Sequence, residues 1–421
     1  MYDSEGNRLL DGPAGMWCMQ TGYGRKEIAE AVATQILNLS YSTSFSLVNK
    51  REVELAERIA SQTPGDLNRV FFTTGGSTAV DSALRLCQLA RNIRGEPDRK
   101  HILTREKAYH GSTYLSASVT GKERDKSAMD TMSENVHFLS APCFYYHSQY
   151  ETEASFCDFL ICELEEKIEE IGANNVMCFI AEPILASGGV IVPPADYHVR
   201  CWETIKNHGI TYIADEVVTG FGRLGHWFAS EAVFGIIPDM VIFAKGLTSG
   251  YVPLGGYAVS DSFIEKISGE NSDGCLYSNG YTWSGNPVAC AAALASWDIL
   301  EREDLLNNVK TLGPYFQAQL QTLRDNPLVG DVRGMGLMAA VEMTVRGNDE
   351  ADLLEKDYAI GEMVDKHCQK LGLLVRPFIN ICIISPPLII NKEQINDLVA
   401  ALRAGLKLTL EELREAEIWI D

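Results

Sequence analysis

The middle of the chain alternates continuous apolar runs with amphipathic segments, and this alternation limits the folds that the chain can adopt. The runs long enough for buried strands are residues 175–181, 209–214 and 239–244, and shorter signals lie at 69–74 and 101–104. The residues from Thr78 to Arg91 have helical periodicity. Strands that are apolar throughout are typical of parallel sheets covered on both faces. The sequence therefore predicts an α/β fold.

The pattern changes after Asn286, where a second and smaller region begins. Its expected elements are a long helical stretch over 287–324, strands near 332–342, 373–376 and 381–385, a helix over 360–371 and a final helix from Lys392. We interpret this region as an α+β domain, with the first 34 residues packed on it. The expected division is a large domain over 35–286 and a small domain formed by 1–34 and 287–421.

The charge balance excludes some classes of partner. The 421 residues include 36 Lys and Arg against 57 Asp and Glu, which gives a formal net charge of −21. A nucleic-acid-binding protein needs basic patches, and so does a protein that docks on an anionic membrane. We therefore expect no nucleic-acid partner and no membrane partner. The acidity itself is most simply explained by solubility.

The eleven cysteines indicate a reducing compartment. Their number is odd, no Cys-x-x-Cys pair occurs, and their spacings match no zinc site. Most have apolar or small neighbours, as buried free thiols do. The N-terminus carries no secretory signal pattern, and no apolar run approaches the ~20 residues of a membrane span. The expected location is the cytoplasm.

Polar residues follow four of the predicted strands at the points where they end. These residues are Gly75-Gly76-Ser77, Glu182, Asp215 and Lys245. One charged residue in such a place is best explained as part of a solvent-facing turn. Four of them are expected to meet, because ligands of parallel α/β sheets bind at the carboxyl ends of the strands. The sequence therefore favours a site at this edge.

Asp215 and Lys245 suggest the chemistry of that site. They lie 30 residues apart, which is close to the length of one βαβ unit. A buried lysine can act as a nucleophile once its pKa is lowered, and a carboxylate can keep a ring nitrogen protonated. Pyridoxal phosphate requires this pair. The freed lysine amine could then serve as general base.

Other candidates are weaker when considered alone. Gly76 and Ser77 precede a helix and could bind a phosphate, but their loop matches neither the dinucleotide fingerprint nor the P-loop. Tyr109 could stack on a flat cofactor or simply be half-buried. Thr282 could donate to a phosphate or belong to a polar loop. Arg376 could bind the carboxylate of a substrate or form a salt bridge within the protein, and the spacing alone favours neither.

Several segments together resemble the class-III aminotransferases of fold type I, which use pyridoxal phosphate. They include Asp215–Arg223, Lys245–Tyr251 and Tyr281–Pro287, and the resemblance covers nearly the whole chain from Asp11 to beyond Pro387. Within this class the chain is most similar to ω-amino acid and amine–pyruvate transaminases, on the segments 15–18, 22–27, 108–113, 181–193 and 375–387. The resemblance implies a large domain with a mostly parallel, seven-stranded sheet and a smaller α+β domain.

The resemblance also implies roles for individual residues. Lys245 would bond to the cofactor and move the proton, and Asp215 would pair with the ring nitrogen. The implied cofactor-binding set is Gly75, Gly76, Ser77, Tyr109, His110, Glu182, Asp215, Val217, Lys245 and Thr282, with Thr282 from the neighbouring subunit of a homodimer or tetramer. The implied substrate-binding set is Trp17, Phe45, Tyr109 and Arg376. No metal is expected.

The expected reaction moves an amino group from an amine or ω-amino acid to pyruvate, giving alanine by a ping-pong mechanism. An aminomutase or a decarboxylating transaminase would use the same cofactor. A nucleotide-dependent enzyme is disfavoured by the missing fingerprint. A cofactor-binding protein of impaired activity is a further alternative, because family members usually carry a few dozen residues before Asp3 that help to close the site. Thr78 and Val80 depart from the Glu and Asn of many relatives. The donor and its preferred enantiomer stay open.

Overall fold

The computed structural model describes residues 1–132, 134–268, 272, 274–344 and 350–416, and they form two compact units. The larger unit consists of residues 24–221 and 226–302. The smaller one combines residues 1–23 and 222–225 with the chain from 303 onward. Within the described residues, no helix has the length and hydropathy that a membrane span requires.

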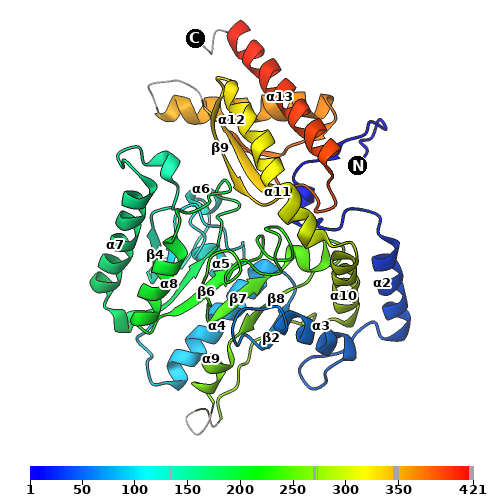
Figure 1. Ribbon diagram of the computed structural model, residues 1–421. Helices are drawn as coiled ribbons and strands as arrows, with labels where there is room; N and C mark the ends of the chain where they lie inside the picture. The colour runs from blue at the N-terminus through cyan, green and yellow to red at the C-terminus, as the bar shows by residue number, and fades with distance from the viewer. Residues whose placement is uncertain (133, 269–271, 273, 345–349, 417–421) are drawn as a thin grey trace. The chain divides into compact units, whose positions relative to one another are not determined.

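A seven-stranded sheet organises the larger unit (Figure 1). Its strand order is β2-β8-β7-β6-β5-β3-β4, and β8 alone runs antiparallel to its neighbours. The strands are β2 (Arg69–Thr73), β3 (His101–Arg105), β4 (Val136–Leu139), β5 (Val176–Ala181), β6 (Thr211–Asp215), β7 (Met240–Phe243) and β8 (Gly255–Val259). The expected α/β class and mostly parallel sheet are confirmed.

Both faces of this sheet are buried, as the apolar strands predicted. Alternate residues of β5 point to opposite faces: Phe179 packs with the helices α7 and α8, while Cys178 and Ile180 pack with α4. All of β5, β6 and β7 is buried. The helices of this unit are α2 (Lys26–Asn38), α3 (Lys50–Ala60), α4 (Gly76–Ile93), α5 (Tyr114–Ser118), α6 (Glu123–Lys126), α7 (Glu153–Ile171), α8 (Tyr197–Asn207), α9 (Asp261–Glu265) and α10 (Pro287–Arg302), with 3-10 turns η1 (Phe144–Tyr146), η2 (Ala173–Asn175) and η3 (Lys245–Thr248).

The observed boundaries differ from the expected division at 34/35 and 286/287. Residues 24–34 and 287–302 belong to the larger unit. The reason is that α10 packs against both α2 and α3, and its buried face includes Ala292 and Ile299, which pack with Ile28 of α2. The last five residues of the expected small domain, 417–421, lie outside the described residues.

The smaller unit has a four-stranded antiparallel sheet with the order β12-β13-β10-β9 and a separate parallel pair, β1 with β11. The strands are β1 (Leu10–Asp11), β9 (Val329–Met335), β10 (Met338–Met343), β11 (Leu373–Leu374), β12 (Pro377–Phe378) and β13 (Ile381–Ile384). Its helices are α1 (Ala14–Trp17), α11 (Leu305–Gln321), α12 (Glu350–Lys370) and α13 (Lys392–Glu415), with the turn η5 (Thr322–Asp325). The α+β character expected for this region is present.

The helical stretch expected over 287–324 is not one helix. It divides into α10 and α11, and the chain turns at Asp304, whose φ is 51°. A non-glycine residue in the left-handed region cannot continue a right-handed helix. The break also coincides with the boundary between the two units.

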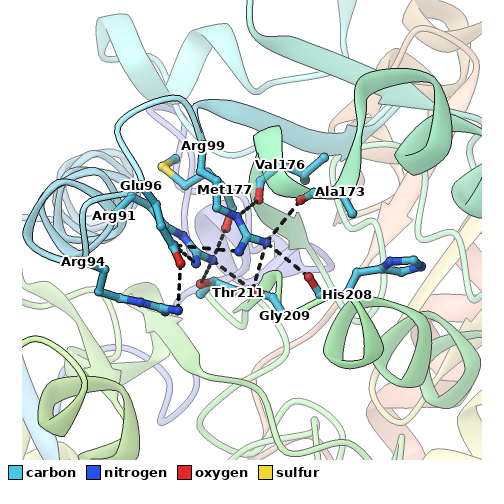
Figure 2. Close-up of polar contacts among 10 residues, drawn as sticks. All are labelled: Arg91, Arg94, Glu96, Arg99, Ala173, Val176, Met177, His208, Gly209 and Thr211. Carbon is cyan, nitrogen blue, oxygen red and sulfur yellow. Dashed lines mark hydrogen bonds and ion pairs between the residues drawn. The ribbon is translucent and has the colours of Figure 1, made fainter.

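Two buried arginines fasten the amino ends of β5 and β6 (Figure 2). Arg91 of α4 donates to the carbonyl oxygens of Met177 and Gly209, at 3.0 and 3.2 Å. Arg99 donates to the carbonyl oxygens of Val176 and Gly209, at 3.0 and 3.1 Å. These side chains thus provide hydrogen-bond donors to main-chain carbonyl groups at and just before the amino ends of the two strands.

Candidate active site

Asp215 and Lys245 lie at the ends of neighbouring strands. β6 ends at Asp215, which lies opposite Ile242 of the parallel strand β7, and Lys245 begins η3 two residues after β7 ends. Lys245 has a φ of 44°. A left-handed conformation costs a non-glycine residue about 1–2 kcal/mol and is often found at functional sites. The sheet thus presents the amine and the carboxylate at its carboxyl edge.

The carboxylate of Asp215 is buried and held from two sides. His110 Nδ1 lies 2.7 Å from Asp215 Oδ2, and the main-chain N–H of Val217 donates to Oδ1 at 3.1 Å. His110 Nε2 has no hydrogen-bond partner among the described residues. With Nδ1 as the donor, the histidine fixes the orientation of the carboxylate.

Glu182 joins two loops at the same edge. Its Oε1 accepts a hydrogen bond from the N–H of Tyr109 at 2.9 Å, and its Oε2 accepts one from the N–H of Ala186 at 3.0 Å. Burial raises the pKa of Glu182, and the charge of Asp215 raises it further. The side chain therefore holds the tyrosine loop in place beside Asp215.

The start of α4 adjoins these groups. A Cβ built on Gly76 would lie 3.3 Å from the methyl carbons of Val217 and 3.8 Å from Ala244. Ser77 Oγ accepts a hydrogen bond from the N–H of Ser112 at 3.1 Å. The free N–H groups of a helix N-terminus attract anions. This glycine-lined helix start fits a phosphate group.

The larger unit thus brings together most of the predicted cofactor residues. Contacts, chain neighbourhood and the pairing of β6 with β7 place the following residues at one edge of the sheet: Gly75, Gly76, Ser77, Tyr109, His110, Glu182, Asp215, Val217 and Lys245. A lysine, a fixed carboxylate and a helix N-terminus fit the amine, ring-nitrogen and phosphate requirements of pyridoxal phosphate. The role of each residue stays a prediction.

Four predicted residues are not shown to join this group. Thr282 and Phe45 are exposed. The ring of Phe45 borders Gly280, where an added Cβ would lie 3.0 Å from it. Trp17 and Arg376 belong to the smaller unit. Both have positive φ, 60° and 45°. Their proposed part in substrate binding is taken up below.

Sequence reasoning missed Arg105, which ends β3 and is fully buried. It donates to the main-chain oxygen of Glu182, and its guanidinium lies 5.8 Å from the centre of the Tyr197 ring. Its Nε and Nη1 have no partner among the described residues. The signal was available, because Arg105 is a further charged residue at the end of an apolar strand.

Lys122 was also missed. Its Nζ lies 5.6 Å from the centre of the Tyr109 ring and donates to Ser187 Oγ at 2.9 Å. Asp125 is at 2.9 Å. Burial lowers the pKa of Lys122, while Asp125 opposes this shift. No sequence pattern distinguishes this lysine from surface lysines, so its place depends on tertiary packing.

Glu216, next to Asp215, has a structural place. Its carboxylate accepts hydrogen bonds from the N–H groups of Ala229 and Ser230 at 2.6 and 2.8 Å, and from the hydroxyl of Thr219 at 3.0 Å. Burial raises its pKa. The two adjacent acids therefore differ, because Asp215 borders the proposed cofactor site and Glu216 anchors the following loop.

Comparison with known proteins identifies the family. The family model described as Aminotransferase class-III matches residues 1–406. A putrescine–pyruvate aminotransferase of Pseudomonas aeruginosa is 39% identical over 411 residues, which are 97% of this chain and 89% of that protein.

Solved structures agree with this match. A thermostable (S)-enantioselective ω-transaminase from Thermomicrobium roseum has a TM-score of 0.92 at 38% identity, covering 97% of this chain and 90% of that one. The ω-transaminase of Pseudomonas jessenii in complex with PMP has a TM-score of 0.91 at 32% identity, covering 97% and 90%. The chain therefore belongs to the class-III aminotransferases and is a pyridoxal-phosphate-dependent enzyme of fold type I.

Proposed function

We propose that the enzyme transfers an amino group from an amine or ω-amino acid to pyruvate, giving alanine by a ping-pong mechanism. The observation that carries this proposal is the junction of Lys245, Asp215 and the start of α4 at one sheet edge. The names of the similar proteins support the substrate classes, because they are a putrescine–pyruvate aminotransferase and ω-transaminases. The candidate donors are β-alanine, taurine, putrescine and other diamines, and aryl-alkyl amines, and the choice among them stays open.

The bound cofactor would supply an electron sink for the pair of electrons left when the donor loses a proton. Asp215 would hold the ring nitrogen in its protonated form, and His110 keeps that carboxylate aligned. Lys245 would bond to the cofactor. Once freed, its amine would take a proton from the carbon that bears the donor's amino group and deliver it to the cofactor. Gly76 and Ser77 would bind the phosphate.

The remaining proposed roles concern the substrate. Arg376 is exposed and carries a permanent charge, which suits a carboxylate of pyruvate or an amino acid. Trp17, Phe45 and Tyr109 would select the donor by apolar contact. A donor that lacks a carboxylate would need Arg376 to turn away, because a guanidinium buried against an alkyl group would be an unpaired charge.

We also propose a homodimer, with tetramers as an open alternative, in which Thr282 reaches the partner's phosphate. An exposed apolar surface supports this proposal: Leu37, Phe45, Leu47 and Val48 are 87, 73, 65 and 67% exposed. Exposed large apolar side chains concentrated in one short stretch of sequence are typical of interaction surfaces. We expect Leu37→Glu to weaken the assembly, which analytical ultracentrifugation measures. The eleven free thiols suit a reducing compartment, and the cytoplasm stays the predicted location.

The decisive experiment follows the visible spectrum of the purified enzyme while a panel of amines and then pyruvate is added. A donor should bleach the cofactor band, and pyruvate should restore it with one alanine formed for each amine consumed. Lys245→Ala is the control, which should bind the cofactor without turnover. A different product, such as carbon dioxide or an isomerised amino acid, would refute transamination to pyruvate.

A further inference from the structure

The segment that carries Trp17 has an unusual backbone. Within α1, Ala14, Gly15 and Trp17 have φ values of 48, 66 and 60°. Each left-handed non-glycine residue costs about 1–2 kcal/mol. Trp17 therefore needs bonds outside its own turn to stay in this conformation, and strain of this kind is retained where its surroundings determine it.

Asp11 supplies those bonds. It is 5% exposed, and its Oδ2 accepts hydrogen bonds from the N–H of Gly15 at 2.8 Å and from the hydroxyl of Tyr23 at 2.5 Å. A hydrogen bond to a charged group contributes about 1.5–3 kcal/mol. Two such bonds are of the right size to offset the strain at Ala14 and Trp17. We call Asp11, Gly15 and Tyr23 the Asp11 clamp.

The clamp is also joined to the segment that carries Arg376. Asp11 lies opposite Leu374 in the parallel pair of β1 and β11, and the N–H of Gly12 donates to the Leu374 oxygen at 3.1 Å. Arg376 follows two residues later, and its Nη1 contacts the sulfur of Met16. The two substrate-binding candidates of the smaller unit thus lie on segments that follow two paired strands.

We infer that Asp11 and Tyr23 are positioning residues that set the donor specificity of the enzyme by fixing Trp17. Neither is assigned a contact with substrate or cofactor. The inference rests on the proposed function, in which Trp17 selects the donor. Removing the Tyr23 hydroxyl deletes one of the two hydrogen bonds to Asp11 Oδ2. The left-handed turn at Trp17 is then held less firmly.

A double-mutant cycle tests this coupling through substrate preference. The measured quantity is the ratio of kcat/KM for an aryl-alkyl amine to kcat/KM for putrescine, with pyruvate saturating. We expect Tyr23→Phe to change this ratio about tenfold, which corresponds to one hydrogen bond to a carboxylate. In a Trp17→Ala background the same substitution should change it less than about twofold. A Tyr23 effect that is equal in both backgrounds overturns the inference.

Tyr315→Phe is the matched control. It removes one tyrosine hydroxyl from the same unit, where that group donates to Asn396 at 2.5 Å rather than to a residue of the clamp. The substrate ratio should stay unchanged in this variant. Asp11→Asn adds a graded test, because the new amide still accepts a hydrogen bond but carries no charge, so its effect should lie between those of Tyr23→Phe and Asp11→Ala.

A second readout does not depend on turnover. Subtracting the spectrum of a Trp17→Phe protein isolates the fluorescence of Trp17. Its quenching by acrylamide should rise about twofold in Tyr23→Phe and stay constant in Tyr315→Phe, if the hydroxyl restrains the turn. If the parent enzyme converts no amine, the proposed function fails, and the quenching then tests only whether Tyr23 fixes Trp17. Equal quenching in parent and Tyr23→Phe proteins overturns it.

Discussion

Arg91 offers a test that separates stability from catalysis. Its guanidinium donates to Glu96 at 2.9 Å, to the oxygens of Met177 and Gly209, and to Thr211 Oγ1 at 3.2 Å (Figure 2). Arg91→Met would remove this donor from the buried Met177 oxygen, from the Thr211 hydroxyl and from the Gly209 oxygen, which Arg99 also contacts. At about 1 kcal/mol for each lost partner, the free energy of opening the amino ends of β5 and β6 should fall by about 3 kcal/mol.

Hydrogen exchange measures that free energy locally, which is useful because a two-unit protein need not unfold in one step. We expect protection of the β5 and β6 amide groups to fall about 100-fold in Arg91→Met. Arg94→Met is the control, since the partly exposed side chain of Arg94 makes one hydrogen bond within the described part of the chain, to Glu96 at 3.0 Å. It should change protection less than about threefold.

Catalysis should respond differently. β5 has six residues, so its amino end lies about 17 Å from the edge that holds Glu182. With cofactor saturating, kcat should stay within about twofold of the parent in Arg91→Met. Equal protection in the Arg91 and Arg94 variants would refute the reasoning, and so would a loss of kcat as large as the loss of protection. Arg91→Met combined with Arg99→Met should be non-additive, because both residues share the Gly209 oxygen.

Two further predictions concern single side chains. In Glu182→Gln, the single amide oxygen can accept only one of the two hydrogen bonds that the N–H groups of Tyr109 and Ala186 donate. Cofactor affinity should therefore fall about tenfold, which a titration of the cofactor-free protein measures. Unchanged affinity would contradict this role. Burial and the neighbouring His101, 2.7 Å away, lower the pKa of His137, so the folded protein binds fewer protons than the unfolded chain in weak acid. Stability should therefore fall as the pH drops from about 7 to about 5, and His137→Phe should reduce the difference between urea midpoints at these two pH values.

The sheet and its functional edge were predictable because they follow from local sequence. Runs such as 176–181 are apolar at every position, which is typical of a strand buried on both faces. Once the sheet is parallel, its strand ends share one edge, so Asp215 and Lys245 must lie near each other. These two steps need no knowledge of side-chain packing.

Contacts across long sequence separations were not predictable in the same way. The pairing of His110 with Asp215 depends on a loop whose path no periodicity reports. The charge of Arg105 at a strand end was visible in the sequence, but its bond to the main-chain oxygen of Glu182, 77 positions away, was not. The division of 287–324 into two helices depends on the backbone conformation of Asp304. The helical pattern continues on both sides of this residue, so the sequence does not indicate the break.

The pairing of β1 with β11 has a consequence for synthesis of the protein. Leu10 and its partner Leu373 are 363 positions apart, so at about 5–20 residues per second the ribosome makes the second roughly 20–70 seconds after the first. Residues 24–302 contain the whole of the larger unit and are complete before that time. The nascent chain must therefore keep its first residues unpaired while the larger unit folds, and the segment with Trp17 should be among the last to acquire its structure and the first to attract a chaperone.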